Sequence, residues 1–137
     1  MSSSSSNQRT ELIGLMPFSE GLGVQLETAD PSAVAGTLPW SAGRCTSGGV
    51  LHGGAIMGLA DTVGALCAYL NLPEGFTTAT IESKTNFFRG VRSGYVRAIA
   101  KPLHVGGRTI VVQTDLTDEQ DRAVALVIQT QAVLPPA

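Results

Sequence analysis

One acidic residue within an apolar helix is the side chain best suited to chemistry in this chain. Asp61 follows His52 by nine residues and lies in the apolar stretch 51–68. Burying an unpaired carboxylate costs several kcal/mol, so such an acid is paired with a distant residue, protonated, or retained because a substrate uses it. Asp61 is therefore a candidate catalytic carboxylate. The alternative is a structural acid that caps a loop or pairs with a basic residue.

Two glycines, Gly53 and Gly54, open the predicted helix and could form an oxyanion site. The first turn of a helix carries free backbone N–H groups and the positive end of the helix dipole, and glycine lets a ligand approach closely. A flexible helix start is the alternative interpretation. His52 precedes the glycines, where a histidine either satisfies backbone groups at the junction of loop and helix or takes part in proton transfer.

The spacing of Gly53 and Asp61 makes a prediction about assembly. Eight residues of helix separate them by about 12 Å, whereas an oxyanion donor and an attacking carboxylate must both lie within roughly 3.5 Å of one reacting carbonyl group. One helix cannot supply both groups. A second copy whose helix runs antiparallel to the first can, so a catalytic Asp61 predicts a homodimer with two equivalent sites.

The predicted helix has two different faces. Bulky apolar residues recur at helical spacing on one face: Ile56, Leu59, Val63, Leu66 and Leu70. Asp61 lies on the opposite face, among one methionine and several small residues: Met57, Gly58, Gly64, Ala65 and Ala68. Glycine costs about 1 kcal/mol in a helix interior, so the two glycines indicate that a ligand or another backbone approaches this face.

The rest of the chain is predicted to be mostly antiparallel β-structure around this helix. Residues 1–9 are expected to form a disordered tail, and residues 10–137 a single domain. A short helix at 11–18 leads into a hairpin of strands 23–29 and 33–40, with Asp30 and Pro31 in its turn. After a loop at 41–49 and the central helix, four strands are expected to form a meander: 77–88, 94–103, 108–117 and 122–134.

Composition limits the possible partners. The 137 residues, 43% of them hydrophobic, suffice for one core, and a net charge of −2 gives no field that would attract nucleic acid or an anionic membrane. Cys45 and Cys67 lack the spacing of a metal site or a disulfide framework, and Cys67 is expected to pack in the core. No signal peptide or membrane span is evident, so we predict a cytoplasmic protein without metal, nucleic-acid partner or membrane association.

Four basic residues near one predicted hairpin either bind phosphate groups or form an ordinary solvated surface. They are Arg89, Arg92, Arg97 and Lys101.

Several short motifs together resemble the hotdog-fold acyl-CoA thioesterases, especially the PaaI-like group of the phenylacetate pathway. The motifs are Gly49-Val50-Leu51-His52-Gly53-Gly54, Leu59-Ala60-Asp61, Thr80-Ile81-Glu82 and Asn86-Phe87-Phe88-Arg89, and the resemblance spans residues 20–134. It implies an α+β hotdog fold, in which an antiparallel sheet wraps a long central helix. It also implies homodimers with active sites between subunits, often paired into tetramers.

The resemblance implies hydrolysis of an acyl-CoA to a carboxylic acid and free CoA, with no cofactor beyond the CoA of the substrate. By motif match, Asp61 is the nucleophile or general base, the Gly53 N–H polarises the thioester carbonyl, and Thr80 positions water. His52 falls near the thioester. Thr46 stands where relatives often carry asparagine, and its shorter side chain can still donate a hydrogen bond. The residues expected to contact substrate are Gly54, Met57, Gly58, Ala65 and Arg89.

Two other functions on the same fold are open at this point. A hotdog hydratase or dehydratase usually has a histidine about five residues after the acid, or an HFPG-type motif, whereas Leu66 stands at that position here. A non-catalytic acyl-CoA-binding sensor often lacks the acid in the helix, and no DNA-binding segment is evident in this sequence. Release of free thiol from acyl-CoA distinguishes the thioesterase from both.

Overall fold

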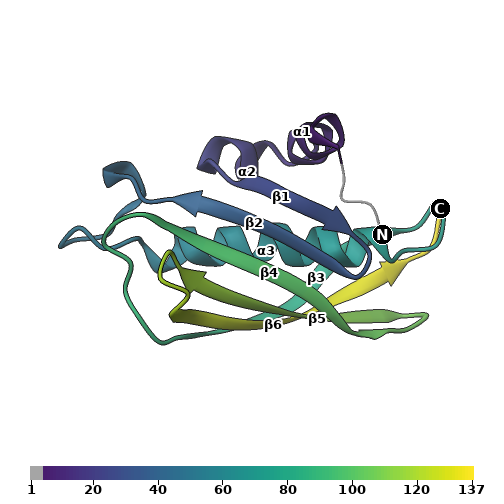
Figure 1. The fold of residues 1–137 in the computed structure, drawn as a ribbon. Helices are drawn as coiled ribbons and strands as arrows, with labels where there is room; N and C mark the ends of the chain where they lie inside the picture. The colour runs from purple at the N-terminus through teal and green to yellow at the C-terminus, as the bar shows by residue number, and fades with distance from the viewer. Residues whose placement is uncertain (1–4) are drawn as a thin grey trace.

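The computed structural model describes residues 5–137 and has one six-stranded antiparallel sheet curled around a long helix (Figure 1). This confirms the predicted α+β hotdog architecture. The elements in chain order are α1 (Ser6–Gly14), α2 (Pro17–Leu22), β1 (Gln25–Asp30), β2 (Ala33–Pro39), a 3-10 turn (Ala42–Arg44), α3 (Gly53–Leu70), β3 (Thr77–Phe87), β4 (Tyr95–Val105), β5 (Thr109–Asp118) and β6 (Ala123–Leu134).

Helix α3 forms the centre of the hydrophobic core. Its bulky face packs against the concave side of the sheet, where Leu59 and Val63 are fully buried and Cys67 is buried as expected. By length and composition α3 could cross a membrane, but more than half of it is buried inside the fold. That is the position of a core helix, which must be apolar on most sides because strands surround it.

The order of the strands in the sheet corrects the predicted meander. The order is β1-β2-β4-β5-β6-β3, so β3 pairs with β6, while β4 crosses over to pair with β2. The connection between β3 and β4 resembles that of a hairpin in length, but it passes the end of α3, where Val91 is buried and its carbonyl accepts from the Leu51 N–H. The crossover leaves β3 as one edge of the sheet and β1 as the other.

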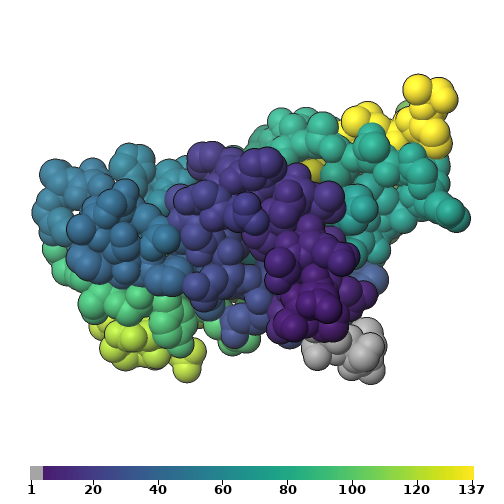
Figure 2. All heavy atoms as spheres, turned by 90° about the horizontal axis from the view of Figure 1, so that it is seen from above, coloured from purple at the N-terminus to yellow at the C-terminus, as the bar shows by residue number. Residues whose placement is uncertain are grey.

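The N-terminal segment corrects a second prediction. Residues 6–9, expected to be disordered, form the first turn of α1, because Ser5 and Gln8 make a reciprocal capping box. Residues 1–4 of the predicted tail lie outside the described residues. The predicted helix at 11–18 is split, since α1 ends at Gly14 and Pro17 begins α2. Figure 2 shows this segment, in purple, lying across the middle of the face seen from above.

Helix α2 packs against α3 through a buried hydrogen bond and a close side-chain contact. The Ser19 and Thr62 hydroxyls lie 2.7 Å apart in the buried interface. A Cβ on Gly58 would lie 2.9 Å from a Leu22 methyl group, so glycine at position 58 lets the Leu22 side chain pack closely against α3. The close approach predicted for Gly58 is therefore made by a helix of the same chain.

Candidate functional site

Asp61 lies on the outward face of α3, and its exposure corrects the expectation of a buried acid. The exposed residues of α3 are Gly54, Met57, Asp61 and Tyr69. The sheet of a single chain covers only the bulky face of the helix, so the face opposite to it stays open. Asp61 needs no buried partner in one chain, and its carboxylate is accessible to a substrate.

Thr80 of β3 lies next to Asp61. Its Oγ1 is 3.4 Å from Asp61 Oδ1 and 2.6 Å from Gln131 Oε1. The ladder between β3 and β6 has a bulge between Thr80 and Glu82, which places Thr80 directly opposite Gln131. A bulge re-aims the side chains beside it. The structure thus brings together two of the predicted site residues, Asp61 and Thr80.

Two glutamines that the sequence analysis missed complete this cluster. Gln129 and Gln131 occupy successive inward-facing positions of β6, and both are fully buried. Gln129 Nε2 donates to Asp61 Oδ1 at 3.2 Å and to Gln131 Oε1 at 2.9 Å. The sequence did contain a sign of them: Gln129 and Gln131 fall on the buried positions of the alternating strand pattern, where the other residues of β6 are alanine or valine. A pair of amides on an otherwise apolar strand face requires partners.

The start of α3 has the geometry expected of an anion site. The His52 Nδ1 atom accepts from the Gly54 N–H at 2.8 Å, so His52 is the N-cap of the helix. Within residues 5–137, the Gly53 N–H makes no hydrogen bond. The phenyl ring of Phe87 lies 3.3 Å from the position that a Cβ on Gly53 would take. Gly53, rather than Gly54, is therefore the free donor at this end of the helix.

The small-residue face of α3 is filled partly by the chain itself. A Cβ on Gly64 would overlap the side-chain carbonyl of Gln129, so this glycine accommodates the buried amide. Gly58 accommodates Leu22 in the same way. The prediction was approach by a ligand or another backbone, whereas side chains of the same chain pack against both glycines; Gly64 is buried and Gly58 is partly exposed. Met57 and Ala65 keep accessible surface on the same face.

Thr46 and Arg89 lie at the Gly53 end of the molecule, in connections rather than in helices or strands. Thr46 is exposed in a tight loop, which its N–H closes by donating to the Val50 carbonyl at 2.9 Å. Arg89 follows β3 directly, and its side chain is exposed. The structure does not bring all four basic residues together, because Arg97 pairs with Glu27 at 2.7 Å elsewhere on the sheet.

An apolar hollow of about 200 Å³ begins one helical turn beyond Asp61. Its lining combines the α1–α2 connection, the outward face of α3 and β3: Leu15, Met16, Ala65, Leu66, Tyr69 and Thr78. Ala65 follows Asp61 by four residues and so lies on the same face, about 6 Å along the helix. An apolar surface therefore lies beside the Asp61 carboxylate, toward the C-terminal end of α3.

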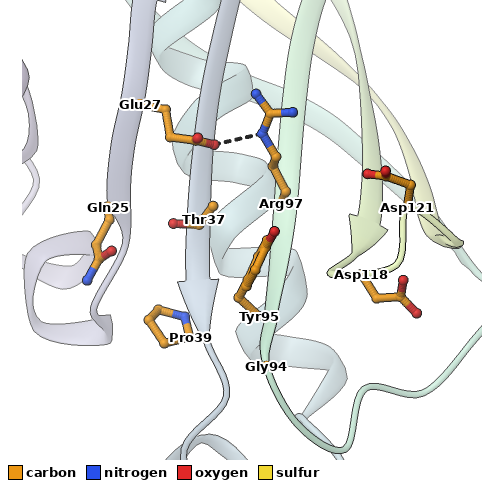
Figure 3. Close-up of a pocket in the computed structure, with 9 residues that line it drawn as sticks. All are labelled: Gln25, Glu27, Thr37, Pro39, Gly94, Tyr95, Arg97, Asp118 and Asp121. Atoms are coloured by element: carbon orange, nitrogen blue, oxygen red, sulfur yellow. Dashed lines mark hydrogen bonds and ion pairs between the residues drawn. The ribbon is translucent and has the colours of Figure 1, made fainter.

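A larger hollow, of about 470 Å³, lies on the outer face of the sheet (Figure 3). Figure 3 shows α3 behind the strands and the ion pair of Glu27 and Arg97 bridging the hollow above Tyr95. Of the residues singled out from the sequence, Arg97 alone lines it, and the Arg97 side chain is already paired with Glu27. Volume alone therefore does not locate the chemistry here, and the smaller apolar hollow beside Asp61 is the better candidate for substrate.

Comparison with known proteins agrees with this fold and identifies the family. Residues 48–125 match the family model described as "Thioesterase superfamily". The chain is 32% identical to the 1,4-dihydroxy-2-naphthoyl-CoA hydrolase of Escherichia coli, over 82% of this chain and 83% of that one. It is 31% identical to the proofreading thioesterase EntH of Cronobacter turicensis, over 75% of each.

A solved structure gives the same result for the fold. A point variant of a thioesterase from Pseudomonas aeruginosa superposes with a TM-score of 0.88 at 26% identity, covering 97% of this chain and 98% of that one. The fold and site thus define a thioester hydrolase with the hotdog architecture. The chain belongs to the thioesterase superfamily.

Proposed function

We propose that the protein hydrolyses acyl-CoA thioesters, with Asp61 as the catalytic carboxylate and the Gly53 N–H of a second copy as the oxyanion donor. The observation that carries this proposal is the exposed Asp61 carboxylate, held by Gln129 between Thr80 and an apolar hollow. A thiolate is a good leaving group, so one carboxylate and one polarising donor suffice; each lowers the barrier by a few kcal/mol.

The reaction needs only the residues described and one water molecule. The thioester carbonyl oxygen accepts from the Gly53 N–H, which polarises the carbonyl carbon. Asp61 attacks that carbon directly or removes a proton from the attacking water. Collapse of the tetrahedral intermediate breaks the C–S bond and releases CoA as the thiolate. In the direct route, water then hydrolyses the mixed anhydride on Asp61, and both routes end with the carboxylic acid.

A homodimer follows from the position of the two groups on one helix. Gly53 and Asp61 lie about 12 Å apart along α3, too far to act on one carbonyl group. Strand β3 supports pairing with a second copy, because it is an edge strand of eleven residues with large apolar side chains exposed, Ile81 and Phe87 among them. Such an edge normally pairs or is covered. Two-fold pairing there would continue the sheet and set the two copies of α3 antiparallel. A tetramer built of two such dimers stays a prediction.

The apolar hollow beside Asp61 is proposed to hold the acyl group. A dry cavity of about 150 Å³ suffices for benzene, so about 200 Å³ gives room for one aromatic ring or a short alkyl chain. The named hydrolase from Escherichia coli acts on an aromatic acyl group, which favours the ring. Of the other predicted contacts, Met57 lies one turn before Asp61, and Arg89 is a candidate for the phosphates of CoA.

The experiment that tests this proposal is release of free thiol from a panel of acetyl-, hexanoyl-, benzoyl- and phenylacetyl-CoA. Ala65→Leu fills part of the hollow one turn from Asp61. We expect it to raise KM for the larger acyl groups and to leave acetyl-CoA hydrolysis close to that of the wild type. Equal effects on all four substrates would place the acyl group elsewhere, and binding without thiol release across the panel would favour the acyl-CoA sensor.

A further inference from the structure

The buried glutamines beneath Asp61 form a directed chain of hydrogen bonds. The chain begins at the backbone of β6, where Thr78 Oγ1 donates to the Ala132 carbonyl at 2.7 Å. The Thr78 hydroxyl has one proton, so it accepts from Gln131 Nε2 at 3.2 Å. This contact fixes the orientation of the Gln131 amide, with Oε1 toward Gln129 and Thr80.

The orientation of Gln131 sets that of Gln129. Because Gln131 presents its carbonyl oxygen, Gln129 must present its Nε2, which donates to Gln131 Oε1 and to Asp61 Oδ1. A flipped Gln129 would place its oxygen against two acceptor oxygens. The Gln129 carbonyl oxygen instead points toward Gly64 and has no hydrogen-bond partner within the described residues. The chain keeps this arrangement although it leaves one buried acceptor unpaired, which costs about 1–3 kcal/mol.

The same chain determines what Thr80 does. Thr80 Oγ1 carries one proton and lies 2.6 Å from Gln131 Oε1 but 3.4 Å from Asp61 Oδ1, so the proton goes to Gln131. The Thr80 oxygen is then an acceptor facing the carboxylate. A water molecule can donate one hydrogen to Thr80 and the other to Asp61, which is the orientation that a general base requires.

We propose that Gln129 and Gln131 are positioning residues of the thioesterase reaction, which make Asp61 Oδ1 a fixed hydrogen-bond acceptor and leave Oδ2 for the substrate or the attacking water. No hydrogen bond reaches Oδ2 within residues 5–137. The N–H bond to Oδ1 fixes the orientation of the carboxylate and so the direction in which Oδ2 faces a substrate or water. This inference rests on the proposed catalytic role of Asp61.

The central test is the kinetics of Gln129→Met, a change that removes the amide and nearly keeps the volume of the side chain. We expect kcat to fall roughly tenfold, because Asp61 loses its anchor, while KM changes less than about twofold. The melting temperature should stay the same or rise, since a buried group with an unpaired oxygen has been replaced by an apolar one. A residue with a purely structural role would not combine lower kcat with retained stability.

Two further variants keep the test independent of how Gln129→Met folds. Gln131→Met removes the acceptor shared by Gln129 and Thr80, and it should lower kcat with little change in KM. Thr114→Val is the matched control, because Thr114 is equally buried on β5 with its hydroxyl unpaired but lies outside this chain of hydrogen bonds. Its kcat should equal that of the wild type.

The combination with Asp61→Asn separates this inference from the proposed function. If Gln129 acts through Asp61, adding Gln129→Met to Asp61→Asn causes no further loss of kcat. Wild-type kcat in folded Gln129→Met, together with an inactive Asp61→Asn, would overturn the inference and leave the proposed function intact. Full activity of Asp61→Asn would overturn both.

Discussion

The His52 Nδ1 atom accepts a hydrogen bond of 2.8 Å from the Gly54 N–H, so the histidine of the Gly-Gly motif caps α3 and leaves the Gly53 N–H unoccupied. We predict that His52→Ala lowers the free energy of unfolding by about 1 kcal/mol, because the helix loses its N-cap. His52→Asn should keep most of the stability, since asparagine is a favourable cap. Urea denaturation measures both, and equal stability of His52→Ala and wild type would contradict the assigned cap.

The Gly53 N–H can be removed without breaking the helix. Proline is favoured at the first helical position, and His52 already has the extended backbone (φ −62°, ψ 135°) that a residue before proline adopts. Gly53→Pro should therefore lower kcat by about 100-fold or more while the protein stays folded.

Gly53→Ala is the matched control for this change. It adds a Cβ against the exposed Phe87 ring but keeps the N–H, so most of the activity should remain. Thiol release measures both variants. Equal losses in the two would assign the effect to the contact with Phe87 and not to the missing donor.

Mixed dimers test whether each site uses two chains. A dimer of one Gly53→Pro chain and one Asp61→Asn chain has one doubly impaired site and one intact site. If random exchange makes half of the dimers mixed, about a quarter of the wild-type turnover should return when two inactive variants are combined. No recovery after verified exchange of subunits would place both groups within one chain.

The two cysteines should differ in reactivity. Burial, with a smaller effect of Asp30, raises the pKa of the Cys67 thiol to about 11, so almost none of it is thiolate at neutral pH. Cys45 is only partly buried. A disulfide reagent at pH 8 should therefore label Cys45 in the native protein and Cys67 only after unfolding. Rapid labelling of Cys67 in native Cys45→Ser would contradict the buried position.

Asp118 gives the turn between β5 and β6 a pH-dependent stability. Burial alone would raise its pKa, but hydrogen bonds from the backbone of Arg122 and Gln120 and from the Arg122 side chain outweigh it and lower the pKa. A lowered pKa in the folded state stabilises the protein fully above the ordinary aspartate value of about 4, and this stabilisation is lost as pH falls below it. Asp118→Asn should thus lower Tm at pH 7, and the difference from wild type should shrink toward pH 2. A constant difference would contradict this account.

The sequence was sufficient for the fold but not for the order of its strands. Alternation of period two identified strands such as β5 and β6, and helical spacing identified α3, because each pattern follows from one buried face. The position of β3 beside β6 depends on how the chain passes the end of α3, and no local pattern encodes that. The capping box could have been recognised from Ser5 and Gln8, three residues apart. The serine-rich composition of this segment favoured a disordered tail instead.

Two of the candidate site residues were suggested by motifs in the sequence. Asp61 and Thr80 were found from the sequence, and the structure places them 3.4 Å apart. Gln129 and Gln131 were missed because polar residues within a strand usually face solvent. Only the alternation of β6 shows that these two fall on its buried face. The exposure of Asp61 could not be inferred from its apolar neighbours, since the sheet of one chain covers only the opposite, bulky face of α3.

The turnover of Asp61→Asn tests the central claim most directly. Asparagine keeps the shape of the side chain and can still accept from Gln129, but it cannot act as a nucleophile or base at neutral pH. We predict that kcat for the best acyl-CoA of the panel falls at least about 100-fold, with an unchanged circular dichroism spectrum. A folded Asp61→Asn variant with wild-type kcat would contradict the account.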